Sequence, residues 1–221
     1  MHEVVVAGAG PVGMVAALRL ARAGVDVLVL ERGPSLAADS KASTFHPPTM
    51  ELLDELGLTG VMDERGLRAP VFQQRDRREG VLAELDLGLL ADETPFPYRL
   101  QLEQNKLTEI ILPLLLATGH ATVRFDARVD RVEDRGDHVR VILGPEGVAL
   151  EDAEVLDTAW LIGADGANSM VRQSLDFGFD GVTFPERFLV MSTTHEFRDD
   201  ISDLALVAYL SDAEEWVVLL R

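Results

Sequence analysis

A glycine-rich turn within the first 31 residues is the feature that most restricts what this chain can fold into. Residues 4–7 are a run of small apolar residues, and Gly8, Gly10 and Gly13 follow at the spacing G-x-G-x-x-G. An Ala/Leu-rich stretch and a second apolar run then lead to Glu31. This order predicts a strand, a tight turn, a helix and a second strand, the unit that binds the ADP part of a dinucleotide.

Each residue of this turn has an expected task. Gly8 permits a sharp backbone turn, Gly10 lets the backbone approach a pyrophosphate, and Gly13 lets the helix lie close to the strand. Pro11 and Val12 stand at the predicted helix start, where unpaired N–H groups face the bound anion. We therefore predict that all five residues contact the cofactor.

The acid at the end of the second predicted strand completes this site. Glu31 is expected to accept hydrogen bonds from the ribose hydroxyls, and Arg32 is counted with it among the cofactor-binding residues. Glycines also occur at ordinary helix starts, but the flanking strand, helix and acid all favour a nucleotide site. They do not distinguish NAD from FAD.

A second glycine-containing turn lies far downstream. Residues 160–172 are typical of a buried strand, a turn that contains Gly163, Asp165 and Gly166, and a short helix. Glycines around Asp165 allow a sharp turn that exposes its carboxylate to a hydroxyl-rich ligand. The alternative is an ordinary Asx turn at the end of a core strand.

Together these segments resemble the flavoprotein aromatic hydroxylases, class A FAD-dependent monooxygenases of the para-hydroxybenzoate hydroxylase type. The resemblance implies that the turn at Asp165 lies beside FAD and takes part in binding both FAD and NAD(P)H. It extends to Lys41, at a position usually held by an arginine near the flavin pyrophosphate, and to Gln104, which matches a glutamine that contacts the flavin. Lysine keeps the charge of arginine but loses its planar, two-pronged contact. Without the resemblance, Gln104 reads as a solvated residue in the first turn of a helix.

The adenine end of the cofactor is expected at a strand pair formed by residues 122–125 and 127–132. In that pair we predict a main-chain contact from Val129.

The resemblance implies an α/β fold in which a Rossmann-like FAD-binding domain is interwoven with a mostly antiparallel β-sheet substrate domain. We assign residues 1–70 and 99–175 to the first domain, and 71–98 and 176–221 to the second. Family members are longer and carry a further Gly-Asp-Ala turn, so we expect the substrate domain to be incomplete and the remainder of the polypeptide, or another segment, to complete the fold. Local patterns predict a helix over 103–118 that Pro113 bends or divides, and strands over 188–196, 204–210 and 216–220.

Composition excludes several classes of function. A formal net charge of −18 repels nucleic acid. No run is long enough to span a membrane and no basic-apolar leader precedes the first strand, so a cytoplasmic protein is predicted. The chain has no cysteine, and its histidines lack the i, i+4 spacing of a ligand pair, so no metal site is predicted.

The resemblance finally implies a reaction. Hydride passes from NAD(P)H to FAD, O₂ reacts to a flavin C4a-hydroperoxide, and one oxygen reaches a small aromatic substrate, phenolic or polyketide-like. His195 and Tyr209 are candidates for a base, but neither is assigned and the catalytic residues stay unknown. Two alternatives remain open: an FAD-dependent reductase or dehydrogenase, and a non-catalytic FAD-binding fragment.

Overall fold

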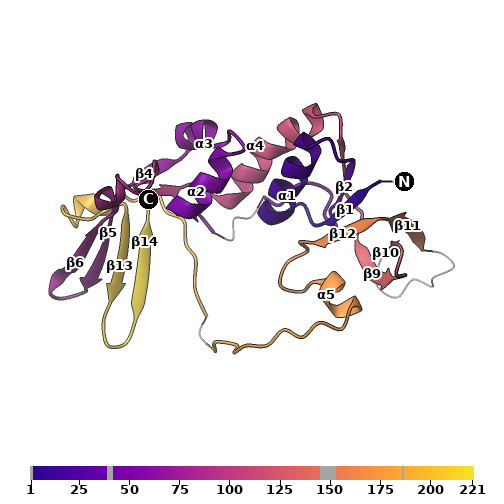
Figure 1. The fold of residues 1–221 in the computed structure, drawn as a ribbon. Coiled ribbons are helices and arrows are strands. Elements are labelled where there is room, and N and C mark those ends of the chain that lie inside the picture. Colours follow the sequence, from indigo (N-terminus) through magenta and orange to yellow (C-terminus); the bar gives the residue numbers. More distant parts are fainter. Residues whose placement is uncertain (1, 39–41, 145–152, 186) are drawn as a thin grey trace. The chain divides into compact units, whose positions relative to one another are not determined.

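The computed structural model describes residues 2–38, 42–144, 153–185 and 187–221 (Figure 1). The chain divides into two compact units, Met1–Ala42 with Glu103–Phe179 and Ser43–Leu102 with Asp180–Arg221. Each unit is therefore assembled from two separated stretches of sequence. The first contains a parallel, Rossmann-like sheet and the second contains mostly antiparallel sheets, which confirms the predicted α/β fold class.

The first unit is built on a four-stranded parallel sheet in the order β12-β1-β2-β8. Two of its strands are fully buried and uninterruptedly apolar, as expected of parallel strands covered on both faces. The expected buried strand before Asp165 instead lies at the edge of this sheet, and Trp160 is 68% exposed. The strands are β1 (Val4–Ala7), β2 (Val27–Leu30), β8 (Ala121–Arg124) and β12 (Trp160–Gly163).

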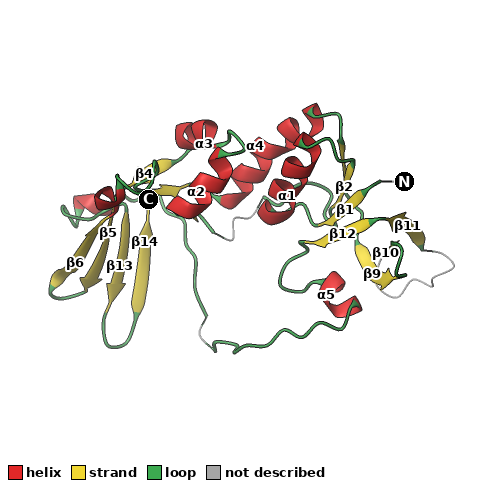
Figure 2. Ribbon diagram, viewed as in Figure 1, coloured by secondary structure: helices red, strands yellow, loops and turns green. Residues whose placement is uncertain are grey.

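Two helices pack side by side on one face of the parallel sheet, α1 (Pro11–Arg22) and α4 (Gln104–Ala117) (Figure 2). Pro113 lies inside α4, which continues past it as one helix, so of the two expected effects of Pro113, a bend or a division, the division is wrong. Pro113 removes one hydrogen bond, from the carbonyl of Glu109. Both residues lie on the exposed side of α4, where water can satisfy that carbonyl.

An antiparallel sheet in the order β11-β10-β9 covers the other face, together with α5 (Met170–Ser174). The expected pairing of residues 122–125 with 127–132 is wrong, because β8 pairs with β2 whereas β9 pairs with β10. The chain turns between them at Asp126, whose φ is 52°. The strands are β9 (Val129–Asp134), β10 (Val139–Leu143) and β11 (Glu154–Thr158).

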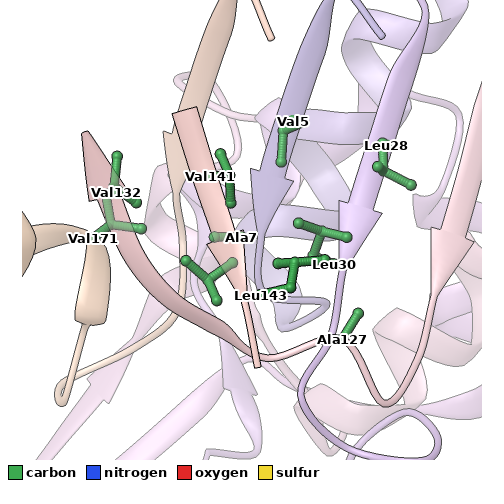
Figure 3. Packing of buried hydrophobic residues seen from close by; sticks show 10 residues of the cluster. Val5, Ala7, Leu28, Leu30, Ala127, Val132, Val141, Leu143 and Val171 are labelled. Carbon is green, nitrogen blue, oxygen red and sulfur yellow. The ribbon is translucent and has the colours of Figure 1, made fainter. Parts of the chain in front are cut away.

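The core of the first unit lies between these two sheets. Apolar side chains of β1 and β2 meet those of β9, β10 and α5, and the contact removes all of them from water (Figure 3). The buried residues of this cluster are Val5, Ala7, Leu28, Leu30, Ala127, Val129, Val132, Val141, Leu143 and Val171.

The second unit contains two sheets, in the orders β14-β13-β5-β6 and β3-β7-β4. Two antiparallel hairpins form the larger sheet, and a parallel contact between β13 and β5 joins them. Its strands are β5 (Val71–Asp76), β6 (Gly80–Asp86), β13 (Val207–Ser211) and β14 (Trp216–Leu220). The smaller sheet contains β3 (Thr44–Phe45), β4 (Leu67–Ala69) and β7 (Arg99–Gln101). The helical segments are α2 (Pro47–Asp54), α3 (Thr59–Arg65), η1 (Leu87–Leu90) and η2 (Phe197–Asp199).

The strand predicted over residues 188–196 is wrong. These residues form no strand, and Phe188 and Val190 are exposed. A strand needs a neighbour to complete its backbone hydrogen bonds, and none of the strands that the structure describes pairs with this segment.

Candidate functional site

The carboxyl ends of β1, β2 and β12 lie at one edge of the parallel sheet. Ala7 is in register with both Leu30 and Gly163, so the residues that follow these three strands are neighbours. The structure therefore brings together the glycine turn, Glu31 and the turn at Asp165, which lie far apart in the sequence. Such an edge is where open α/β sheets bind their ligands.

Two of the three glycines in the first turn are required by packing. Gly8 has a φ of +104°, and a Cβ there would lie 2.4 Å from the carbonyl oxygen of Ala164. A Cβ on Gly13 would lie 2.0 Å from the carbonyl oxygen of Gly8. Gly8 thus lets the two turns touch, and Gly13 lets α1 begin directly against the first turn.

Gly10 differs, because a Cβ at this position would meet no atom of the described residues within 4 Å. It precedes α1, which starts with Pro11, has no side-chain cap and carries no acidic residue in its first turn. Val12 at this helix start is 72% exposed. Nothing among the described residues requires a glycine at position 10. A ligand that approaches the uncapped start of α1 would require one, because a side chain there would block its approach.

Glu31 turns its carboxylate toward the backbone of the site. Its Oε2 accepts a hydrogen bond from the N–H of Ala9 at 2.8 Å, and its Oε1 accepts one from the N–H of Gly33 at 3.0 Å. Glu31 therefore holds the glycine turn in place, a task that the sequence did not reveal. Its contact with ribose hydroxyls stays a prediction, as does the role of the exposed Arg32.

Asp165 is half-buried, and its carboxylate caps the start of α5. Oδ1 accepts a hydrogen bond from the Ser169 hydroxyl at 2.5 Å, and Oδ2 accepts from the N–H of Met170 at 2.6 Å and of Val171 at 3.2 Å. The expectation of an exposed carboxylate is therefore wrong: these local donors turn it toward the helix. The backbone of Asp165 still lies beside Gly8.

Residues 31–33 are tied to residues 124–127 by three backbone hydrogen bonds of 2.9 Å, including that from the Ala127 N–H to the Glu31 carbonyl. Beside this junction is an open hollow of about 370 Å³. Val129 lies next to it, with its side chain in the core and its backbone paired to Leu143. The hollow is lined by Arg32, Arg124, Asp126, Ala127, Arg128, Leu143, Gly144 and Glu154.

The remaining predicted residues are less completely placed. Gln104 is the first residue of α4, half-buried, and its N–H donates to the carbonyl of Ala42 at 2.9 Å. Lys41 lies outside the described residues. Gly166 has a φ of +86° and would meet no protein atom with a Cβ. His195 belongs to the second unit, is exposed, and pairs with Asp200 at 2.6 Å.

The first unit has a parallel sheet whose strands end in a glycine turn, an uncapped helix start and an acidic residue, Glu31. Together these features define a dinucleotide-binding domain. The chain belongs to the family described as FAD binding domain, whose model matches residues 1–218. This family and the monooxygenases that the chain resembles confirm the resemblance seen in the sequence.

The para-nitrophenol 4-monooxygenase of Pseudomonas sp. (strain WBC-3) is 31% identical over 221 residues, which are 100% of this chain and 53% of the relative. The 6-hydroxy-3-succinoylpyridine 3-monooxygenase of Pseudomonas putida is 35% identical over 197 residues, 89% of this chain and 49% of the relative. The crystal structure of p-nitrophenol 4-monooxygenase from Pseudomonas putida DLL-E4 superimposes with a TM-score of 0.88 at 30% identity, covering 100% of this chain and 54% of that one. The chain thus spans about half the length of these relatives. Among its described residues, no helix is both long and apolar enough to cross a membrane.

Proposed function

We propose that the chain binds FAD within a monooxygenase that hydroxylates an aromatic substrate with NAD(P)H and O₂. The proposal depends on one observation: the turn from Gly8 to Gly13, Glu31 and the turn at Asp165 lie together at one edge of the parallel sheet. At this edge, the space around Gly10 is open. The FAD binding domain and the names of the relatives as monooxygenases support the reaction type. The domain assignment, the cytoplasmic location and the need for further polypeptide stay predictions.

In this proposal, the pyrophosphate lies against Gly10 and the start of α1, where Val12 and Gly13 supply N–H groups and Pro11, which has none, fixes the backbone of the first helical residue. A helix N-terminus attracts an anion because its N–H groups are unpaired and its dipole is positive there. The open space at Gly10 fits this group, since a side chain there would occupy the position of the phosphate.

Other residues hold the rest of the cofactor. Glu31 accepts from the ribose, Arg32 lines the hollow at the adenine end, and Val129, which lies next to that hollow, makes a main-chain contact. The flavin half is assigned to Lys41, Gln104, Gly163, Asp165 and Gly166. When bound, FAD carries electrons from NAD(P)H to O₂ so that one oxygen atom reaches the substrate. The chain's own residues bind and orient it, and Asp165 keeps the second turn in shape by capping α5.

The test is the affinity for FAD of a Gly10→Val variant of the full-length protein, measured by quenching of flavin fluorescence. The valine should abolish binding but leave the thermal midpoint of unfolding of the FAD-free protein nearly unchanged, because a Cβ at Gly10 meets no atom of the described residues. Gly60→Val is the matched control, since Gly60 also has open space around it but lies in α3. Unchanged FAD affinity in Gly10→Val would refute the proposed site.

A second candidate, an FAD-dependent reductase or dehydrogenase, uses the same binding residues. Isotope-labelled O₂ separates the two. Label in a hydroxylated aromatic product supports the monooxygenase, whereas NAD(P)H consumption without labelled product supports the alternative.

A further inference from the structure

Strand β7 of the second unit carries two polar side chains on one face. Arg99 and Gln101 are two residues apart, and side chains alternate along a strand, so both lie on the face opposite the buried Leu100. Gln101 is only 6% exposed and Arg99 is half-buried. Polar groups in such positions are normally satisfied by hydrogen bonds.

Arg99 is held by aromatic residues from the larger sheet of the same unit. The centre of its guanidinium lies 3.7 Å from the centroid of the Phe72 ring, and one terminal nitrogen donates to the Tyr209 hydroxyl at 3.0 Å. Phe72 and Tyr209 themselves make an edge-to-face contact, with ring centroids 6.4 Å apart. This arrangement fixes the cation in place without neutralising it.

The hydrogen-bonding capacity of this pair is incompletely used. The Nε of Arg99 and the Nε2 of Gln101 are both buried and have no hydrogen-bond partner among the described residues, although Thr44 donates to the Oε1 of Gln101 at 3.1 Å. The Tyr209 hydroxyl accepts from Arg99, which leaves its own proton free to donate. The two buried side-chain atoms left without a described partner on this face, the Nε of Arg99 and the Nε2 of Gln101, are both donors.

The charge of Arg99 is also uncompensated. The chain has 38 acidic and 20 basic residues, yet no carboxylate of the described residues forms an ion pair with Arg99. Its positive charge reaches His46, which follows β3: burial, and then the charge of Arg99, lower the pKa of that imidazole. A fixed cation with spare donors and no described ion-pair partner suits an anionic ligand group.

We propose that Arg99 and Gln101, with Tyr209 positioning Arg99, bind an anionic oxygen on the ring of the aromatic substrate. The inference rests on the proposed function and deepens it, because it selects ionised aromatic compounds over neutral ones. Phenolate and carboxylate share the required chemistry, an acceptor-only oxygen that carries negative charge.

The test is isothermal titration calorimetry of the full-length protein, with its FAD content recorded. The paired probes are 4-nitrophenolate, at a mildly alkaline pH where it is ionised, and 4-nitroanisole, its uncharged methyl ether. Benzoate against benzamide forms the second pair and distinguishes a carboxylate from a phenolate site. Arg99→Met and Gln101→Leu should each weaken binding of the anion by about 10-fold to 100-fold, the range for a hydrogen bond to a charged group. Binding of the uncharged partner should change little.

Arg78→Met is the matched control, because it removes the same charge from an exposed position in the turn between β5 and β6. It should leave the anion affinity unchanged. Arg99→Lys keeps the charge but loses the planar set of donors, so an intermediate affinity is expected, and circular dichroism verifies the fold of each variant.

Equal losses for the anion and the uncharged probe, or wild-type affinity in both β7 variants, would overturn the inference. A protein that holds FAD but binds no anionic probe also overturns it, and leaves the proposed function intact. Conversely, Arg99-dependent binding of 4-nitrophenolate by a protein that cannot hold FAD supports the inference and refutes the proposed function.

Discussion

Replacing Asp165 with alanine should loosen α5 and the turn that lies beside Gly8. The carboxylate accepts three hydrogen bonds, from the Ser169 hydroxyl and from the N–H groups of Met170 and Val171. Each contributes about 1 kcal/mol net, and the partial exposure of the site limits the extra gain from its charge. We therefore expect the free energy of unfolding to fall by about 2–3 kcal/mol. The helix has only five residues, so its first turn depends strongly on this cap.

Urea unfolding of the full-length protein, followed by circular dichroism, measures this loss. Ser169→Ala is the matched control, because the Ser169 hydroxyl also accepts from the Arg172 N–H at 3.0 Å and its loss weakens the same helix without removing the carboxylate. Both variants should be less stable, but Asp165→Ala should weaken FAD binding more, since only Asp165 adjoins Gly8. A change below about 0.5 kcal/mol in Asp165→Ala would refute the capping argument. Equal losses of FAD affinity would show that Asp165 acts only through α5.

Two other sites give further expectations. Glu31→Ala leaves the N–H groups of Ala9 and Gly33 without their acceptor and removes the proposed ribose contact. The Kd for FAD, measured by fluorescence titration, should therefore rise by about tenfold or more. An unchanged Kd would mean that Glu31 has a structural role only. Burial, together with the hydrogen bond to Asp63, raises the pKa of Tyr98 from 10.0 to about 12. The folded protein thus keeps this proton longer than the unfolded chain, so the resulting stability is complete below pH 10.0 and is lost as the pH rises toward about 12. Absorbance titration of the two tyrosines should show this late transition and lose it in Tyr98→Phe.

Local sequence patterns predicted the parts of the fold that depend on near neighbours. The β1–α1–β2 unit has its glycines, helix and acid within one short stretch, so each local preference agrees with the final structure. Residues 188–196 show the opposite case. Their apolar character is typical of a strand, but a strand also needs a partner, which local sequence does not contain.

The candidate site divides in the same way. Gly8 and Gly13 have the close contacts that their spacing predicts. The capping role of Asp165 was missed, although Ser169 at a helix start is a signal that could have revealed it. The contact between Arg99 and Tyr209 joins residues 110 positions apart, and no spacing rule reaches that far.

The two-segment construction of the first unit has a consequence for synthesis of the protein. β1 emerges from the ribosome early, but its neighbour β12 follows only after the whole of Ser43–Leu102 has been made. The contact of the Ala164 carbonyl with Gly8 therefore cannot form until all the residues between them have been translated. Such distant pairings form slowly, because a long loop must close before any contact stabilises it. A nascent chain can thus expose its glycine turn long before it has a complete place for the cofactor, which makes cofactor capture a late event in its folding.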